Sequence, residues 1–400
     1  MATVQLTTAQ KVRGWDFKLN EMSRPRDIFG LVRGIYRDGE PVKNSFLVST
    51  KSGSGEMRKT MTLIKDLVGT GRFGKQGLLG YEEIQSTQEM SVYADEVKHG
   101  VPYETYGYQF AEKDPYGFIP KINGMVSDWH EKMDGLRIRQ AICEKLDQAL
   151  VHAQTNTGLS ASNKYPHSNI FVVGNTVAGT EFIASTAQPA YSATIATYAG
   201  AINTLITDGT KGWAVANQVM PKSTKFLDVI VEWAATNRLI QGISGLGSEL
   251  VYIHTMPTHA VTETMEIVQK LNMYTDGEKA RMGGLGRIYR NLILAEDVKA
   301  PRCTIAASTL TFSYWGITDS RAAAGNTAAD VGFLLGASAV FEYVVERMHW
   351  EKEVQNYGQT VGLGAFRTNG YNRCDWDDVD GTNSDNRKNY TSGLIFYKSN

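Results

Sequence analysis

The stretch from Asn123 to Gln154 limits the possible folds of this chain most strongly, because it contains no proline and its apolar residues recur at helical spacing. This pattern predicts one long amphipathic helix with a single buried face. At about 1.5 Å per residue it would be roughly 45 Å long, so an extended structure should lie against it. The apolar stripe consists of Met125, Val126, Trp129, Met133, Leu136, Cys143, Leu146, Leu150 and Val151. The polar residues on the rest of the helix include Glu131, Arg137, Lys145 and Gln148. Gly135 costs about 1 kcal/mol relative to alanine, yet we expect one continuous helix.

The length and composition of the chain indicate a soluble globular protein with more than one subdomain. Its 400 residues exceed what one core usually covers, and 42% are apolar, 21% are charged and the formal net charge is −1. No apolar run is long enough for a signal peptide or a membrane span, so we expect neither. Cys143, Cys303 and Cys374 lack metal-binding spacing, which favours a reducing compartment.

The N-terminal segment is basic and resembles an arm more than a core. Residues 1–59 hold eleven lysines and arginines against six acids, whereas residues 76–100 hold five acids against one lysine. We therefore expect these two segments to meet, either within a subunit or between subunits.

A projecting β-hairpin is expected after this arm. Residues Met57–Val68 and Glu89–Val101 favour strands, and the glycine-rich stretch Gly69–Gln85 between them is too long for a tight turn. Such a long projecting loop usually contacts another molecule.

Beyond Thr197 the pattern changes to helices alternating with apolar strands, which predicts a second, α/β subdomain. The expected helices are 198–205, 224–240 and 260–271, and the expected strands are 250–254 and 288–295. The C-terminal run that begins at Ser392 predicts a last strand added to an existing sheet.

One motif suggests phosphate chemistry. Residues Gly69–Lys75 fit both G-x-G-x-x-G and G-x-x-x-x-G-K directly after a predicted strand. However, Gln76 replaces the hydroxyl residue that binds Mg²⁺, and Gly77 and Gly80 occupy positions where a helix should begin. Two alternative functions stay open on these patterns. One is a P-loop-like nucleotide-binding enzyme that uses Gly69–Lys75, which these two departures disfavour, and the other is an α/β small-molecule-binding module formed by Thr197–Ala324.

Other sequence patterns give no candidate catalytic, cofactor or metal residue. His254 and His259 are five residues apart around Pro257, which does not suit two metal ligands on one helix face. The acidic stretch Asp375–Asp385 lacks the glycine register and the closing glutamate of an EF-hand. We expect no enzyme activity and no cofactor.

Two blocks of sequence have distinctive residue patterns. The block Gly69–Val101 contains Leu78, Gly80, Glu82 and Glu83, followed by Lys98-His99-Gly100-Val101. The block Leu334–Arg373 has an apolar Gly-Ala segment and the pattern Tyr357, Gly358 and Gly362. In these two blocks the chain resembles the major capsid proteins of Enquatro-type (N-four-like) tailed bacteriophages.

This resemblance implies an α+β fold of the Hong Kong 97-like capsid type. Its parts would be an N-terminal arm, an extended β-hairpin called the E-loop, a peripheral domain with a long spine helix, and an axial α/β domain. The corresponding ranges are 1–55 for the arm, 56–113 for the hairpin, 114–197 and 331–400 for the peripheral domain, and 198–330 for the axial domain.

The resemblance also implies a function. The chain would assemble with itself into hexamers and pentamers of an icosahedral virion capsid around double-stranded DNA, bound non-specifically, in the cytoplasm of a bacterial host. A portal would be a further partner, a scaffold or decoration protein is left open, and no membrane is involved. The residues expected to contact neighbouring subunits are Arg72, Phe73, Leu78, Leu79, Tyr81, Glu82, Glu83 and Ile84.

Overall fold

The structure is a computed structural model that describes part of the chain. The described residues are 28–29, 46–51, 55–64, 87–104, 118–143, 170–177, 180–184, 227, 230–231, 243–244, 250–258, 260, 287–289, 292–306, 309–316, 328–355, 360–378, 388–389 and 391–398.

The predicted long helix is present as α4, Phe118–Cys143, and it passes through Gly135 as one element. It begins before the expected Asn123, because Pro120 falls in the first turn, where a missing backbone N–H costs nothing. The expected stripe residues Leu146, Leu150 and Val151, and the polar Lys145 and Gln148, lie outside the described residues.

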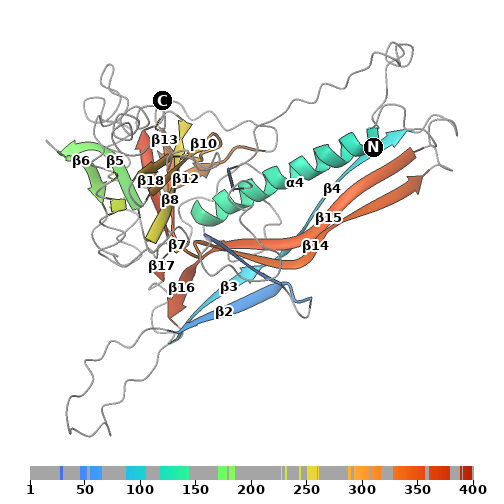
Figure 1. The fold of residues 1–400 in the computed structure, drawn as a ribbon, viewed down its shortest axis with the longest axis horizontal. Helices are drawn as coiled ribbons and strands as arrows, with labels where there is room; N and C mark the ends of the chain where they lie inside the picture. Colours follow the sequence, from blue (N-terminus) through green and yellow to red (C-terminus); the bar gives the residue numbers. More distant parts are fainter. Residues whose placement is uncertain are drawn as a thin grey trace, which may run out of the picture.

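A long, mostly antiparallel sheet lies along α4, as expected from the length of the helix (Figure 1). Its order is β1-β14-β15-β4, with β1 at Leu47–Lys51, β14 at Val340–Gln355, β15 at Thr360–Arg373 and β4 at Asp95–Glu104. β1 pairs with β14 in parallel, and the other pairs are antiparallel. We call these four strands the long sheet.

The base of the predicted hairpin forms a second sheet. β2, Arg58–Ile64, pairs antiparallel with β3, Thr87–Tyr93, as expected. β16, Asp375–Asp378, and β17, Lys388–Asn389, extend this sheet on the β3 side. The expectation of one strand over Glu89–Val101 is wrong, because the chain changes sheets at Ala94: β3 pairs with β2, whereas β4 pairs with β15.

A ten-stranded sheet among the described residues forms the third part, with the main path β6-β5-β18-β13-β8-β10-β9. The predicted strands at 250–254 and 288–295 are present, the second as two strands, β9 and β10. The bounds are β5 Ile170–Val177, β6 Thr180–Ala184, β7 Ile243–Ser244, β8 Leu250–Pro257, β9 Arg287–Tyr289, β10 Leu292–Asp297, β11 Arg302–Ala306, β12 Thr309–Ser313, β13 Ala328–Leu335 and β18 Ser392–Lys398.

Strand pairing in this sheet crosses the domain limits expected from the sequence. The last strand, β18, lies between β13 and β5 in the interior of the sheet, and β13 also pairs with β8. Segments from the ranges 114–197, 198–330 and 331–400 therefore share one sheet. Of the three expected helices, Leu227, Ile230, Val231 and Ala260 are helical, and the rest of those helices lies outside the described residues.

The described residues of the expected arm, residues 1–55, include a part that packs into the body of the protein. Ile28, Phe29, Phe46 and Leu47 belong to the main hydrophobic core. The Phe29 ring lies 6.1 Å from that of Phe46 and 6.2 Å from that of Phe333 on β13. Isolated apolar pairs in a basic segment thus join the core, where each large side chain contributes about 1.5–3 kcal/mol on full burial.

Candidate functional site

β15 is the centre of the structure, because its two faces hold different elements. Successive side chains of a strand point to opposite faces. Its odd-numbered residues from Ala365 to Arg373 contact or approach α4, whereas Gly370 and Asn372 face the base of the β2–β3 hairpin. α4 and the hairpin accordingly lie on opposite sides of the long sheet (Figure 1).

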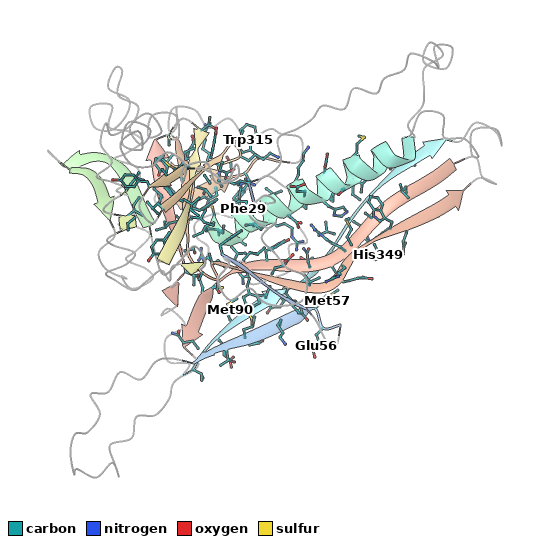
Figure 2. The ribbon with its side chains drawn as sticks, viewed as in Figure 1. Phe29, Glu56, Met57, Met90, Trp315 and His349 are labelled. Carbon is teal, nitrogen blue, oxygen red and sulfur yellow. The ribbon has the colours of Figure 1, made fainter. Side chains whose placement is uncertain are left out.

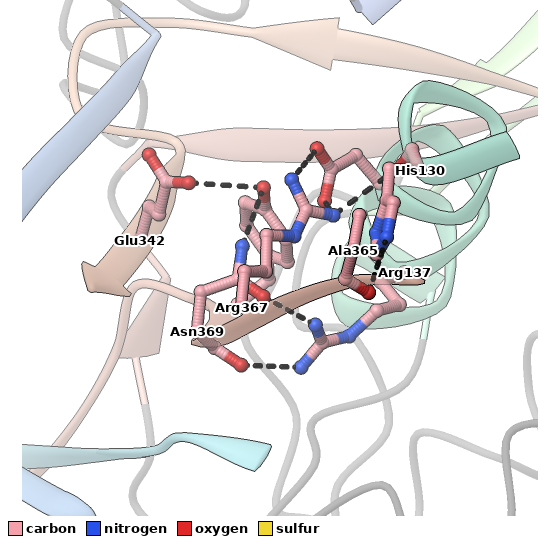
Figure 3. A network of polar contacts seen from close by, with 8 residues as sticks. His130, Arg137, Glu342, Ala365, Arg367 and Asn369 are labelled. Atoms are coloured by element: carbon pink, nitrogen blue, oxygen red, sulfur yellow. Dashed lines mark hydrogen bonds and ion pairs between the residues drawn. The ribbon is translucent and has the colours of Figure 1, made fainter. Parts of the chain in front are cut away.

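On the α4 face, Arg367 makes a buried ion pair with Asp134 (Figure 3). Its Nη1 donates to Asp134 Oδ2 at 2.6 Å, and its Nη2 donates to Asp134 Oδ1 and, at 3.3 Å, to the carbonyl oxygen of His130. A two-pronged guanidinium–carboxylate contact fixes direction as well as distance. It therefore sets how α4 lies along β15.

His130 adds a second contact one helical turn before Asp134. Its Nε2 lies 3.2 Å from the carbonyl oxygen of Ala365 and donates to it. Burial lowers the pKa of His130, and the nearby Arg367 guanidinium lowers it further. The ring is therefore neutral at pH 7, with the proton on Nε2.

Arg137 continues the network toward β14. Its two terminal nitrogens donate to the side-chain and main-chain oxygens of Asn369, both at 2.6 Å, and its guanidinium lies 5.4 Å from the ring centre of Tyr371. The Asn369 amide donates to the Tyr371 hydroxyl at 3.2 Å, and that hydroxyl donates to Glu342 on β14 at 3.0 Å. Burial lowers the pKa of Arg137.

Two stripe assignments made from the helical pattern are corrected here. Arg137 is not on a polar face, since only 2% of it is exposed, and Met125 is not buried, since it is 56% exposed. The reason is that the inner half of α4 is enclosed on all sides, so its polar residues are buried against polar groups of β15.

The inner end of α4 is joined to the other two sheets by further buried arginines. Arg373 donates to Asp375 of β16 at 2.6 Å and to the carbonyl oxygens of Ile142 and Cys143 at 3.2 Å. These last carbonyls of a helix otherwise lack partners. Arg139 donates to both carboxylate oxygens of Asp297 on β10, at 3.0 and 2.6 Å.

On the opposite face, the hairpin base contacts the long sheet directly. A Cβ at Gly370 would lie 1.8 Å from the carbonyl oxygen of Tyr93, so only glycine fits under this crossing. Asn372 donates to the Ser91 carbonyl at 2.9 Å. A small core joins the two layers, and Met90 lies within it (Figure 2). Its members are Met90, Val92, Ala94, Phe341, Tyr343 and Cys374.

The outer strand of the hairpin, β2, is exposed at residues 58–60 and 62, whereas Met61 is partly buried against the small core. Met57 is 53% exposed, and Arg58 donates to the Ser91 hydroxyl at 2.9 Å while its guanidinium lies 5.3 Å from the Tyr93 ring centre. The residues expected to contact neighbours, Arg72, Phe73, Leu78, Leu79, Tyr81, Glu82, Glu83 and Ile84, lie outside the described residues, as does the Gly69–Lys75 motif.

The sequence analysis missed the polar residues that β15 directs at α4. The available signal was the alternation of Arg367, Asn369, Tyr371 and Arg373, which places large polar groups on one face of a strand. In the described part of the chain, His, Cys, Asp and Glu form no cluster suited to a metal ion. No helix in that part is long and apolar enough to cross a membrane.

Comparison with known proteins identifies the fold. No protein-family model matches the sequence, and no curated protein matches it. Among solved structures, a chain of the cyanophage Pam1 capsid aligns with a TM-score of 0.61 and 13% identity, covering 100% of this chain and 99% of that one.

Two further phage structures agree. A capsid chain of Ralstonia phage GP4 gives a TM-score of 0.57 and 14% identity, covering 90% of this chain and 89% of that one. A chain of the head of Helicobacter pylori bacteriophage KHP40 gives 0.56 and 12%, covering 99% and 100%. The chain therefore has a bacteriophage capsid fold over nearly its whole length.

Proposed function

We propose that this chain is the major capsid protein of a tailed bacteriophage. It assembles with itself into the pentamers and hexamers of an icosahedral head that encloses double-stranded DNA. The observation that carries the proposal is the fold it shares, over at least 90% of its length, with capsid and head chains of three phages.

The geometry supports a protein that works through contacts between subunits. The long sheet extends beyond the ten-stranded sheet, and the base of the hairpin lies on the face of the long sheet opposite α4 (Figure 1). Exposed Met57 and Met125 lie on the hairpin base and on the outer part of α4. Large apolar side chains on projecting elements gain burial only against another molecule.

The finer assignments are part of the same proposal. The fold is of the Hong Kong 97-like type, and the subfamily is the Enquatro-type phages. The peripheral domain comprises residues 114–197 and 331–400, with α4 and most of the long sheet, and the axial domain comprises residues 198–330. The ten-stranded sheet takes strands from both, and β2–β3 is the base of the E-loop. The hairpin tip, including Arg72, Phe73 and Tyr81, contacts a neighbouring subunit.

The proposed partners are other copies of the chain, a portal, a scaffold or decoration protein, and DNA held without sequence preference. Assembly takes place in the cytoplasm of the bacterial host, and the chain acts without a catalytic centre. The charge difference between residues 1–59 and 76–100 favours a salt-sensitive contact between arm and hairpin.

The test is negative-stain electron microscopy of the full chain expressed alone and with candidate phage partners. Closed shells of uniform size are expected. A chain that stays monomeric under all these conditions and binds Mg-ATP with micromolar affinity would instead favour the P-loop-like enzyme.

A further inference from the structure

β15 contains an asparagine followed directly by a glycine, Asn369 and Gly370, and the structure shows why each residue stands there. Asn369 supplies Arg137 with two acceptors, its side-chain and main-chain oxygens, both at 2.6 Å (Figure 3). Gly370 lies under the main chain of Tyr93, where a Cβ would come within 1.8 Å of the carbonyl oxygen. Packing on the two opposite faces of one strand thus places these two residue types next to each other.

An asparagine followed by glycine is the asparagine pair most prone to deamidation, because glycine has no side chain to shield its main-chain nitrogen. The Gly370 nitrogen, after losing its proton to hydroxide, attacks Cγ of Asn369. The N–Cγ bond forms, the Cγ–Nδ2 bond breaks, and ammonia leaves after taking a proton from water. Water then opens the cyclic imide at one of its two carbonyl groups and leaves either aspartate or isoaspartate at position 369.

In the folded chain, the position of Asn369 in the long sheet prevents this reaction. Ring closure requires the main chain of Asn369 to rotate out of the extended conformation. Asn369 pairs with Val344 of β14 on one side and with Asp95 of β4 on the other, so both ladders oppose that rotation. The residue is 1% exposed, which keeps hydroxide away, and its amide donates to the Tyr371 hydroxyl at 3.2 Å. The pair is therefore protected by the fold and not by its own chemistry.

The sequence contains one other Asn-Gly pair, Asn123-Gly124, which provides an internal comparison. It lies near the beginning of α4, where Gly124 is exposed and a Cβ placed on it would meet nothing within 4 Å. The surroundings of Gly124 therefore leave room for a changed main chain, whereas those of Gly370 do not. In the unfolded chain the two pairs have the same local chemistry.

Conversion of Asn369 would disrupt the contacts that this residue makes in the folded chain. Aspartate only accepts hydrogen bonds, so it cannot donate to Tyr371, and it adds a carboxylate to the buried network that ends at Glu342. Isoaspartate adds one atom to the main chain immediately before Gly370, where the crossing under Tyr93 leaves no space. Either product therefore weakens the contact between α4 and the long sheet.

We propose that Asn369-Gly370 is a modification site that reacts only in the unfolded chain and so limits the time that a chain can remain unfolded. A chain that stays unfolded too long is converted at Asn369 and no longer packs α4 against β15. A chain that folds promptly is protected afterwards. Chemical modification of the unfolded state makes unfolding irreversible in this way. The inference holds for the single chain and does not depend on the proposed function.

Peptide mapping of the full chain tests the protection. One sample is kept folded in mildly alkaline buffer, and another is kept in the same buffer with guanidinium chloride. Trypsin places the two pairs in separate short peptides, 122–132 and 368–373, so each conversion is followed independently. In denaturant, Asn123 and Asn369 should convert at similar rates. In the folded sample, conversion of Asn369 should be slower by about a hundredfold or more, because only the small unfolded fraction reacts.

Refolding tests the consequence of conversion. Chains aged in denaturant are diluted into buffer, and the soluble fraction that melts cooperatively is mapped beside the aggregated fraction. Chains converted at Asn369 should be depleted from the refolded fraction by about tenfold, whereas chains converted at Asn123 should be equally represented in both. The variant Asn369→Gln keeps an amide but cannot form the five-membered ring, so its refolding yield should fall much more slowly with ageing time than that of the wild type.

Three results would contradict the inference. Conversion of Asn369 at the same rate in the folded and denatured samples would show that the long sheet does not protect it. Conversion of Asn123 without conversion of Asn369 in denaturant would show that the site is not reactive. An equal share of Asn369-converted chains in the refolded and aggregated fractions would overturn the limit on unfolded time. Each of these results leaves the proposed function standing, since particle formation tests that function separately.

Discussion

The main chain at Tyr93 crosses β15 directly over Gly370, with the Tyr93 carbonyl oxygen only 1.8 Å from where a Cβ on Gly370 would lie. This crossing coincides with the change of sheets at Ala94, whose N–H donates to the Met57 carbonyl at 2.8 Å. The position of the hairpin relative to the long sheet therefore depends on the absence of one side chain.

Gly370→Ala should consequently destabilise the chain and move the hairpin base, since the new methyl group meets main-chain atoms that cannot rotate away. We expect a loss of about 1–3 kcal/mol or more, as for overpacking in a core. Urea unfolding measures it. Gly362→Ala on the same strand is the control, because its nearest neighbour would be 3.8 Å away. Equal stability of the two variants would contradict the close crossing.

Asp134→Ala should lower the free energy of unfolding by about 3–5 kcal/mol, because it leaves the buried Arg367 guanidinium without its carboxylate. The double variant Asp134→Leu with Arg367→Leu removes both charges and should be more stable than Asp134→Ala alone. Lys98→Ala is the control, since Lys98 is 62% exposed beside Glu96 and should change stability by less than about 1 kcal/mol. A single variant as stable as this control would show that the pair does not hold α4.

Acid should weaken the ten-stranded sheet through His254. This ring lies between the Phe333 carbonyl, 3.1 Å from Nδ1, and the Tyr397 hydroxyl, 2.5 Å from Nε2. Burial lowers the pKa of His254 to about 4, and burial also raises the pKa of Tyr397. The unfolded chain, with an ordinary histidine pKa near 6.5, therefore binds more protons between these two values.

The contribution of His254 to the free energy of unfolding is thus complete above about pH 6.5 and decreases as the pH drops toward 4. Between pH 7 and pH 5 the contribution of His254 corresponds to a loss of about 2 kcal/mol. Urea unfolding at several pH values measures the slope, and His254→Gln should flatten it. Because the pKa of His130 is also lowered, this residue further decreases the free energy of unfolding as the pH drops. An unchanged slope in His254→Gln would show that this ring does not carry the effect.

Deleting Thr70–Ile84 and joining the ends with a short Gly/Ser linker should separate folding from assembly. The described strands β2 and β3 keep their register from Arg58–Tyr93 to Ile64–Thr87, and Gly370 and Asn372 still hold the hairpin base. We expect a cooperative melt in circular dichroism and no closed shells in electron microscopy. Normal shells from the deleted chain would contradict an inter-subunit role for the tip.

The helix and the hairpin base could be predicted from the sequence because their signals are local. Period 3.6 over α4 and β-favouring residues on both sides of a glycine-rich stretch do not depend on distant partners. The division at Ala94 could not be predicted in this way, since β3 and β4 are nearly continuous in sequence and differ only in which distant strand each one meets.

The buried polar network between α4 and β15 could not be predicted from the sequence for a related reason. Arg137 belongs on a surface by composition alone, and it is buried because Asn369, more than two hundred residues away, supplies two acceptors. Likewise, Phe29 lies in a segment that resembles an arm, yet it joins the main core through Phe333 on β13 and Arg139 on α4, and Phe46 packs against Phe29. Long-range partners decide these cases, and a single sequence does not display them.

The central claim is that this chain builds a shell from contacts between copies. Cryo-electron microscopy of particles from the expressed chain tests it most directly. The account predicts closed icosahedral shells of pentamers and hexamers, with α4 and the hairpin on opposite sides of each long sheet and the hairpin tip against a neighbouring subunit. Open aggregates or monomers only, or shells in which the hairpin tip contacts its own subunit alone, would contradict it.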